Sequence, residues 1–170
     1  ALLAVGHLVG GNPPYFWTYL LGVLCLAGLA CSGQTAFNQL SSSAGPALPW
    51  VGLLLAVEWH LVWAAASGME TILQALLSVT LFALLLRPAS PRLFFAAGAL
   101  VGFSAWVRPD GLTLIGPALF AALLFPGPAR SRLTRAGLTL AGFALLFIPY
   151  LGFNLALAGE LWPNTFFAKQ

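Results

Sequence analysis

Six apolar runs separated by short polar turns limit most strongly how this chain can fold. The runs are continuous rather than alternating, which favours helices over the strands of a membrane barrel. Their lengths approach the roughly 20 residues that a helix needs to cross the hydrocarbon core of a bilayer. They comprise residues 15–30, 47–66, 71–86, 93–107, 112–125 and 136–153.

The composition excludes the main alternatives to a membrane protein. Only 6% of the 170 residues are charged and 60% are apolar, whereas a soluble domain carries about 25% charged residues. A globule of this size cannot bury so much apolar surface, which argues against a soluble monomer. Seven Lys and Arg residues are too few for a nucleic-acid-binding face. We expect an all-α, polytopic transmembrane helix bundle with about six spans, in contact with membrane lipid.

The chain divides into three expected parts. Residues 1–14 are predicted to be the end of an extracytoplasmic loop with an interfacial helix, because their apolar stretch is too short to span and ends in Gly-Gly-Asn-Pro-Pro. Residues 15–153 form the transmembrane bundle, and residues 154–170 begin an extracytoplasmic segment. No initiator Met or cleavable leader opens the sequence, so we interpret it as an internal piece of a longer protein.

The charges in the turns predict an orientation. Turns 87–92 and 130–135 hold five of the seven basic residues, and the positive-inside rule places such turns in the cytoplasm. The loop at 32–46 is expected on the same side, although it has no Lys or Arg. The turns at 67–71 and 108–111, with the tail, then lie outside and contain three of the four acidic residues.

Ordinary structural interpretations exist for the outer polar residues. Ser67-x-x-Glu70 matches a capping box, in which the Ser oxygen accepts an orphan helix N–H and the Glu reaches back. Asp110 is placed to cap the helix that follows the 108–111 turn. Lys169 can snorkel to lipid headgroups. The functional alternatives are that Glu70 faces a polar cavity and that Arg108, with Lys169, grips a phosphate.

The other polar or reactive residues carry weaker signals. Glu58 and His60 lie within the second run, and side chains two apart on a helix point to different sides, so we do not expect them to pair. Cys25 and Cys31 are interpreted as small apolar fillers. No triad order, phosphate loop or metal-ligand spacing is present in the sequence. We interpret the scattered glycines as a sign of close helix packing and not as a Gly-x-x-x-Gly motif within an apolar run.

Three motifs, at residues 67–71, 108–111 and 163–169, occur in a characteristic order and carry a family resemblance. Together they resemble the polytopic glycosyltransferases of the GT-C superfamily, in the branch that holds the mycobacterial terminal arabinofuranosyltransferase. The resemblance covers about residues 1–170, with a departure at Leu157-Ala158, where aromatic residues are expected. The motifs are Ser67-Gly68-Met69-Glu70-Thr71, Arg108-Pro109-Asp110-Gly111 and Pro163-Asn164-Thr165-Phe166-x-Ala168-Lys169.

The resemblance implies an enzyme of the bacterial inner (cell) membrane with an extracytoplasmic active face. Such enzymes move a sugar from a polyprenyl-phosphate carrier to a glycan, lipid or protein acceptor. Their presumed catalytic base would precede Ala1, so we expect no catalytic residue in this piece, and the isolated piece is expected to be inactive. Arg108 and Lys169 would bind the donor phosphate, and Glu70, Asp110 and Asn164 would bind sugar or acceptor. No cofactor is firmly implied, and a divalent cation at the carboxylates is an alternative.

Two other classes stay open at this point. A transporter or a non-catalytic membrane subunit, including a pseudo-enzyme, would share the helical frame. Transporters commonly have helices that are broken at mid-bilayer. Here most polar residues gather at one rim, which favours interfacial chemistry, whereas Glu58 and His60 favour a transporter.

Overall fold

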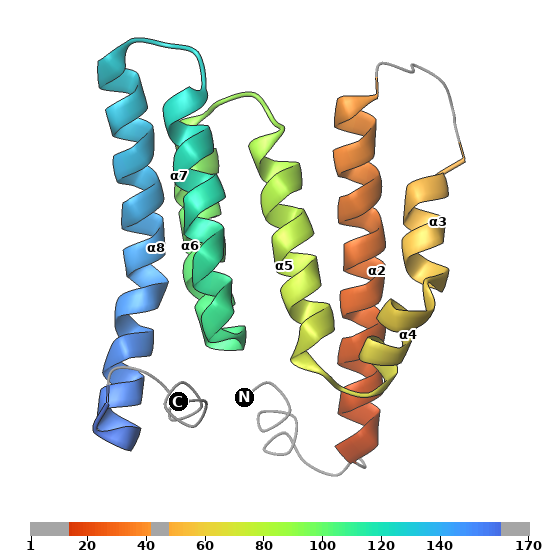
Figure 1. The fold of residues 1–170 in the computed structure, drawn as a ribbon. Helices are drawn as coiled ribbons and strands as arrows, with labels where there is room; N and C mark the ends of the chain where they lie inside the picture. The colour runs from red at the N-terminus through yellow and green to blue at the C-terminus, as the bar shows by residue number, and fades with distance from the viewer. Residues whose placement is uncertain (1–13, 42–47, 161–170) are drawn as a thin grey trace. The chain divides into compact units, whose positions relative to one another are not determined.

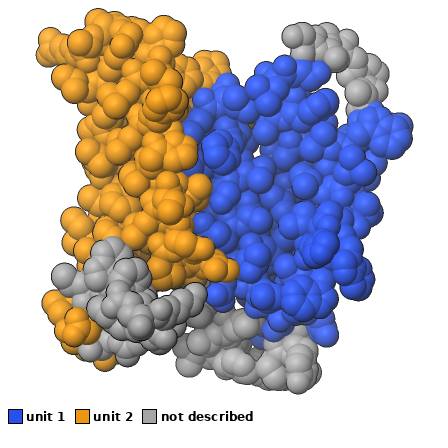
Figure 2. All heavy atoms as spheres, viewed as in Figure 1, with its two compact units in different colours: residues 1–86 blue, residues 87–170 orange. Residues whose placement is uncertain are grey.

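Helices and the turns between them make up the part of the chain that the computed structural model describes, residues 14–41 and 48–160 (Figure 1). No strand occurs among these residues, so the predicted all-α class is confirmed for them. The chain forms two units, residues 1–86 and residues 87–170 (Figure 2). The interfacial helix predicted within residues 1–14 lies outside the described residues, apart from Pro14 at the start of the first helix.

The first unit is built around one long helix. Helix α2 (Pro14–Leu40) packs against α3 (Trp50–Val57), α4 (Trp59–Ala66) and α5 (Glu70–Leu85). Its core is small and apolar, and the close contacts depend on residues without long side chains. A Cβ atom at Gly22 would collide with the Ala65 carbonyl oxygen. The buried core residues are Leu29, Ala64, Ala65 and Ile72.

The predicted loop at residues 32–46 is wrong in its first part, because α2 continues to Leu40. Polar side chains in this part of α2 form hydrogen bonds to other residues of the same helix. Thr35 donates to the Cys31 carbonyl oxygen at 2.8 Å, and Gln34 Nε2 donates to Asn38 Oδ1 at 2.7 Å. Gln34 Oε1 also accepts from the Gly52 N–H at 3.0 Å, which ties α2 to α3. Polar composition alone therefore does not end this helix.

The second apolar run is not one span but two helices of 8 residues each, α3 and α4. The break falls at Glu58, whose backbone is extended and whose Oε2 accepts from the Leu61 N–H at 2.8 Å, capping α4. Glu58 Oε1 lies 2.8 Å from His60 Nδ1. Our expectation that these side chains diverge is wrong, because the chain at Glu58 is not helical. Each short helix is about 12 Å long.

In the second unit the strongest association is between two parallel helices. It contains α6 (Pro91–Val107), the 3₁₀ helix η1 (Pro109–Leu114), α7 (Ile115–Leu124) and α8 (Ala129–Ala158). Helix α8 packs mainly on α6 and less extensively on α7. Gly98 faces Thr139, and Gly102, further along α6, faces Phe143 and Leu146, so α6 and α8 run in the same direction. Helix α7, which precedes α8 in the chain, runs in the opposite direction (Figure 1).

Three glycines bring α6 and α8 unusually close. A Cβ at Gly98 would collide with the Thr139 carbonyl oxygen, and one at Gly142 with the Phe95 carbonyl oxygen. A Cβ at Gly102 would lie 2.6 Å from the Phe143 carbonyl oxygen. Gly98 and Gly102 are four residues apart, the spacing at which small residues allow helix backbones to meet. The expectation that glycines mark close packing is confirmed here, but the interpretation that no Gly-x-x-x-Gly motif occurs within an apolar run is wrong, because Gly98 and Gly102 form one in α6.

Two boundaries in this unit differ from the predicted ones. The fifth run was expected to be helical from residue 112, but its first residues belong to η1 and α7 begins at Ile115. The basic stretch 130–135 was expected as a turn, but it forms the first turns of α8, and the actual turn is at residues 125–128. Arginine is a good helix former, so the charged stretch extends the apolar helix rather than interrupting it. At its other end α8 continues to Ala158, five residues beyond the predicted limit of the bundle.

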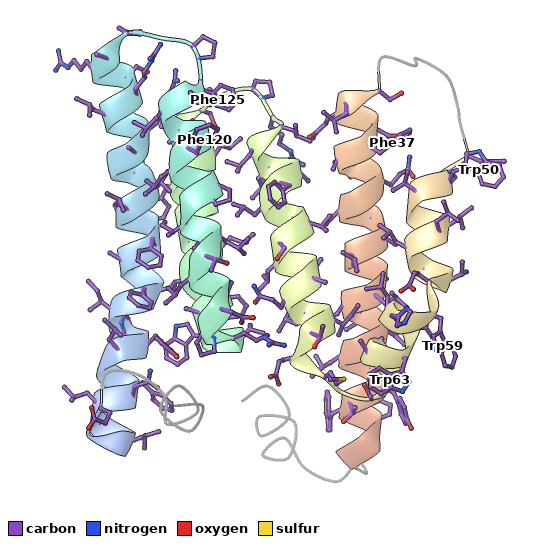
Figure 3. The ribbon with its side chains drawn as sticks, in the orientation of Figure 1. Phe37, Trp50, Trp59, Trp63, Phe120 and Phe125 are labelled. Carbon is purple, nitrogen blue, oxygen red and sulfur yellow. The ribbon has the colours of Figure 1, made fainter. Side chains whose placement is uncertain are left out.

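Within residues 14–41 and 48–160, two helices are long and apolar enough to cross a membrane, Phe16–Leu40 and Ala129–Leu157. Only 11% of each hydrophobic window is buried within the protein. Apolar helices at residues 70–85, 91–107 and 109–124 are shorter, and a bundle of six spans is not confirmed. Trp50 and Trp59 are 61% and 69% exposed and point away from α2 (Figure 3). This surface is compatible with membrane insertion.

Gly142→Ala is expected to destabilise the protein, whereas Gly137→Ala on the same helix is not. The first Cβ would collide with the backbone of α6, and overpacking of this kind costs about 1–3 kcal/mol. Nothing lies within 4 Å of a Cβ at Gly137, so that substitution gains up to about 1 kcal/mol of helix propensity. Thermal unfolding of the two purified variants in detergent measures the difference. Equal Tm values would contradict the close contact.

Candidate functional site

The Arg108-Pro109-Asp110-Gly111 turn lies at the end of α6. Helix α6 stops there because proline disfavours a helical conformation at the residue before it, and Arg108 is accordingly extended, with φ −148° and ψ 137°. The Arg108 N–H still donates to the Ser104 carbonyl oxygen at 2.9 Å. The Gly111 N–H donates to the Arg108 carbonyl oxygen at 2.9 Å, so the predicted tight turn is confirmed.

Arg108 and Asp110 form an ion pair across this turn. Arg108 Nε donates to Asp110 Oδ1 at 3.1 Å, and the side chains are 37% and 63% exposed. An ion pair this exposed contributes at most about 1 kcal/mol to stability. The Nη1 and Nη2 groups of Arg108 make no hydrogen bond to any residue in the described ranges. The pair therefore orients the guanidinium group and leaves its two terminal nitrogens without a partner among the described residues.

The prediction that Asp110 caps the following helix is wrong. The helix after the turn is η1, and no side chain caps its start. The Asp110 carboxylate is directed to Arg108 instead, and Thr113 Oγ1 donates to the Asp110 backbone carbonyl oxygen at 2.8 Å. Pro109 occupies the first position of η1 and lacks an N–H, which reduces the number of donors that need a cap.

Ser104 fixes the turn to α6 from within the core. Its buried hydroxyl lies 2.7 Å from the Val101 carbonyl oxygen and 3.1 Å from the Gly111 carbonyl oxygen, so its one proton is shared between them. A Cβ at Gly111 would lie 2.6 Å from Ser104 Oγ and 2.8 Å from the Ser104 carbonyl oxygen. Only glycine fits at this position, which sets how closely the turn approaches the helix.

Trp106 anchors the same end of α6 to α8. Its indole Nε1 donates to the Leu146 carbonyl oxygen at 2.8 Å, and its ring meets Tyr150 edge to face at a centroid distance of 5.6 Å. Pro149 interrupts the backbone hydrogen bonds of α8 next to this carbonyl. A hydrogen bond between groups in an apolar surrounding is costly to break. Arg108 therefore lies two residues beyond a part of α6 that is anchored to α8 by Trp106.

Glu70 is the first residue of α5, but the capping box predicted there is wrong. The N-cap position is Met69, and no side chain caps the helix. Ser67 Oγ instead donates back to the Ala64 carbonyl oxygen at 3.2 Å. Gly68, with φ +71°, turns the chain after Ser67, so that Ser67 ends α4 rather than starting α5. The Glu70 side chain is exposed, and its charge suits the positive end of the helix dipole.

Of the five predicted site residues, the structure brings together Arg108 and Asp110. Glu70 belongs to the first unit, and its role beside this pair stays a prediction. Asn164 and Lys169 lie outside the described residues. No cluster of three or more His, Cys, Asp or Glu side chains that could hold a metal occurs within 14–41 and 48–160.

Sequence reasoning missed the residues that support the turn. Trp106 donates to a backbone carbonyl of α8 that lies 40 residues further along the chain, whereas Ser104 contacts Gly111, only seven residues away. One signal was present in the sequence: an indole N–H in an apolar helix needs a hydrogen-bond acceptor. The position of that acceptor depends on the register of α6 against α8.

The comparisons with known proteins add no relative. No protein-family model, curated protein or solved structure matches this chain.

Ser104→Ala is expected to lower the free energy of unfolding by about 1 kcal/mol or more, because it leaves the buried Gly111 carbonyl oxygen without the hydroxyl donor. Ser78→Ala is the matched control, since Ser78 Oγ donates only within its own helix, to the Gln74 carbonyl oxygen. Thermal unfolding in detergent compares the two variants. A loss at Ser78 as large as that at Ser104 would refute the role of Ser104 in holding the turn.

Proposed function

We propose that this chain is part of an integral-membrane glycosyltransferase that moves a sugar from a polyprenyl-phosphate carrier to an extracytoplasmic acceptor. The observation that carries the proposal is the presentation of Arg108. Its guanidinium group is half-exposed at the end of an apolar helix, is oriented by Asp110 through Nε, and offers its terminal nitrogens outward. The order of the three sequence motifs supports the same conclusion.

This arrangement suits the chemistry of the transfer. The acceptor oxygen forms a bond to the anomeric carbon while the bond from that carbon to the phosphate oxygen breaks, and the carrier leaves as a phosphate anion. A base takes the acceptor proton, and donors placed at the phosphate stabilise its growing charge. We assign the phosphate to Arg108, with Lys169 as second cation. Following the family resemblance, we assign the base to a residue before Ala1.

The remaining site residues receive roles that follow from their chemistry. Asp110 accepts from Arg108 through Oδ1, and we assign its second oxygen to a sugar or acceptor hydroxyl. Glu70 and Asn164 are assigned the same kind of partner. A divalent cation bound by Asp110 or Glu70 is the alternative. The bacterial cell membrane, with the Arg108 end of α6 outside, is the location that we propose.

A transporter is the second candidate, and one observation favours it. The second apolar run breaks at Glu58, as the discontinuous helices of transporters do. However, the Glu58 carboxylate is already used, because Oε2 caps α4 and Oε1 meets His60. His60 is 87% exposed, so the pair does not enclose a binding site within its unit. The break is explained by capping.

Arg108→Ala in the full-length protein is expected to lower kcat/KM for the polyprenyl-phosphate sugar on the order of 100-fold. Truncating a charged partner of a phosphate costs several kcal/mol, and each 1.4 kcal/mol corresponds to about tenfold. Arg108→Lys should recover part of the loss, since lysine keeps the charge but not the fork. Radiolabelled sugar transfer in membranes measures the effect.

Arg92→Ala is the control for this experiment. Arg92 is exposed at the first turn of α6, a full helix length from Arg108, so its loss removes the same charge at the other end of the unit. We expect transfer within twofold of the unaltered protein. Unchanged donor affinity and turnover in Arg108→Ala would refute the assignment.

A further inference from the structure

A pocket lies at the end of the second unit opposite to Arg108. It has a volume of about 430 Å³ and is formed by the segment before α6 together with the first turns of α8. Its walls combine guanidinium groups, hydroxyls and aliphatic carbon, contributed in part by Ser90, Arg130, Ser131, Thr134, Arg135 and Leu138.

The charge at this end of the unit is entirely positive. Arg87 and Arg92 flank the start of α6, and three more arginines lie in the first two turns of α8. The acidic residues of the unit, Asp110 and Glu160, follow the other ends of these helices. Because α6 and α8 are parallel, both helix N-termini also lie at the arginine end. No carboxylate in the described part of this unit neutralises the five arginines.

Arg135 builds the wall of the pocket. Its Nη1 donates to the Phe125 carbonyl oxygen at 2.9 Å, and its Nη2 donates to the Pro126 carbonyl oxygen at 3.1 Å. Its guanidinium carbon lies 5.8 Å from the centre of the Phe94 ring and 5.9 Å from that of Phe125. These contacts hold the positive charge of Arg135 in place at the pocket. None of them involves another arginine.

Arg130 and Ser131 supply donors that the fold does not use. Neither the Arg130 guanidinium nor the Ser131 hydroxyl hydrogen-bonds to another residue of the described ranges. Of the other two hydroxyls, Thr134 Oγ1 donates its proton to the Arg130 carbonyl oxygen, whereas Ser90 Oγ accepts from the Leu93 N–H and keeps its own proton. An arginine fork beside a hydroxyl fits a phosphate group.

The aliphatic side chains at the pocket favour a lipid over a free anion as its ligand. Leu138 lines the pocket, and the neighbouring Leu133 is 69% exposed. Further along α8, Leu145 and Ile148 are also exposed, so the same helix carries further apolar side chains that a hydrocarbon tail can contact. A ligand with a phosphate head and a hydrocarbon tail would satisfy both parts of this surface. Inorganic phosphate would use only the first.

We propose that this pocket binds the headgroup of an anionic phospholipid, with the phosphate held by Arg130 and Ser131 in the field of Arg135. Basic pockets between membrane helices on the cytoplasmic side are recurring sites for such headgroups. The proposal does not depend on the glycosyltransferase function. It concerns the opposite end of the unit from Arg108 and assigns a structural lipid rather than a substrate.

The test uses the full-length protein in detergent, with phosphatidylglycerol as the probe. Native mass spectrometry and thermal unfolding follow binding as mixed micelles containing phosphatidylglycerol are added. We expect phosphatidylglycerol to bind and to raise Tm, whereas phosphatidylcholine and inorganic phosphate leave Tm unchanged. Arg130→Ala should weaken phosphatidylglycerol binding about tenfold, and Arg92→Ala, which removes the same charge outside the pocket, by less than twofold.

Three results would overturn the proposal. Equal weakening by Arg130→Ala and Arg92→Ala would show general attraction by surface charge. Equal binding of phosphatidylcholine would show that the charge is irrelevant. Stabilisation by inorganic phosphate as large as that by phosphatidylglycerol would show a free-anion site. Arg130 is exposed and its side chain holds no other described residue, so loss of folding is not expected, and an unchanged circular dichroism spectrum checks this.

Discussion

The close approach of α6 and α8 is the contact on which the second unit depends. At Gly98, Gly102 and Gly142 a backbone carbonyl of the facing helix occupies the space that a Cβ would need. Because the two helices are parallel, this one contact also separates the charges. It gathers the arginines and both helix N-termini at one end, and it places the Arg108 turn at the other. In a surrounding without water, such backbone packing replaces the hydrophobic effect as the force between helices.

The same contact explains how an exposed arginine is held in place. Trp106 fastens the last turn of α6 to the Leu146 carbonyl oxygen, and Ser104 fastens the following turn to α6. Arg108 needs only one further bond, from Nε to Asp110. The ion pair adds little stability because water competes for it. Its effect is orientation, which is the property that a phosphate-binding guanidinium group requires.

The sequence predicted the positions of the helices better than their ends. Apolar runs locate α2, α5, α6 and α8, because burial and membrane contact act on the whole run. The breaks depend on single side chains, and there the predictions were wrong. Glu58 was taken as mid-helix and in fact caps the start of α4. Ser67 was taken as the N-cap of the next helix and in fact ends α4, just before the turn at Gly68. In both cases the backbone conformation around the residue decides whether its side chain starts or ends a helix. A pattern of residue types does not specify that conformation.

The candidate site was predictable where its residues are close in sequence. Arg108 and Asp110 share one turn, so their proximity follows from local geometry, although the pairing itself was not expected. Ser104 and Trp106 required knowledge of which carbonyls lie opposite them. Beside the Trp106 indole, the Gly98-x-x-x-Gly102 spacing was a second sequence signal, since it marks the face of α6 that meets another helix, but it was not interpreted as a packing motif.

Labelling of single cysteines in intact cells tests the central claim, that the two ends of the second unit face opposite sides of a membrane. Thr113→Cys reports on the Arg108 end and Ala129→Cys on the arginine end, in full-length protein with Cys25 and Cys31 replaced by alanine. A maleimide that cannot cross membranes should label Thr113→Cys in intact cells and Ala129→Cys only after permeabilisation. Labelling of both from outside, or the reverse pattern, would contradict the account.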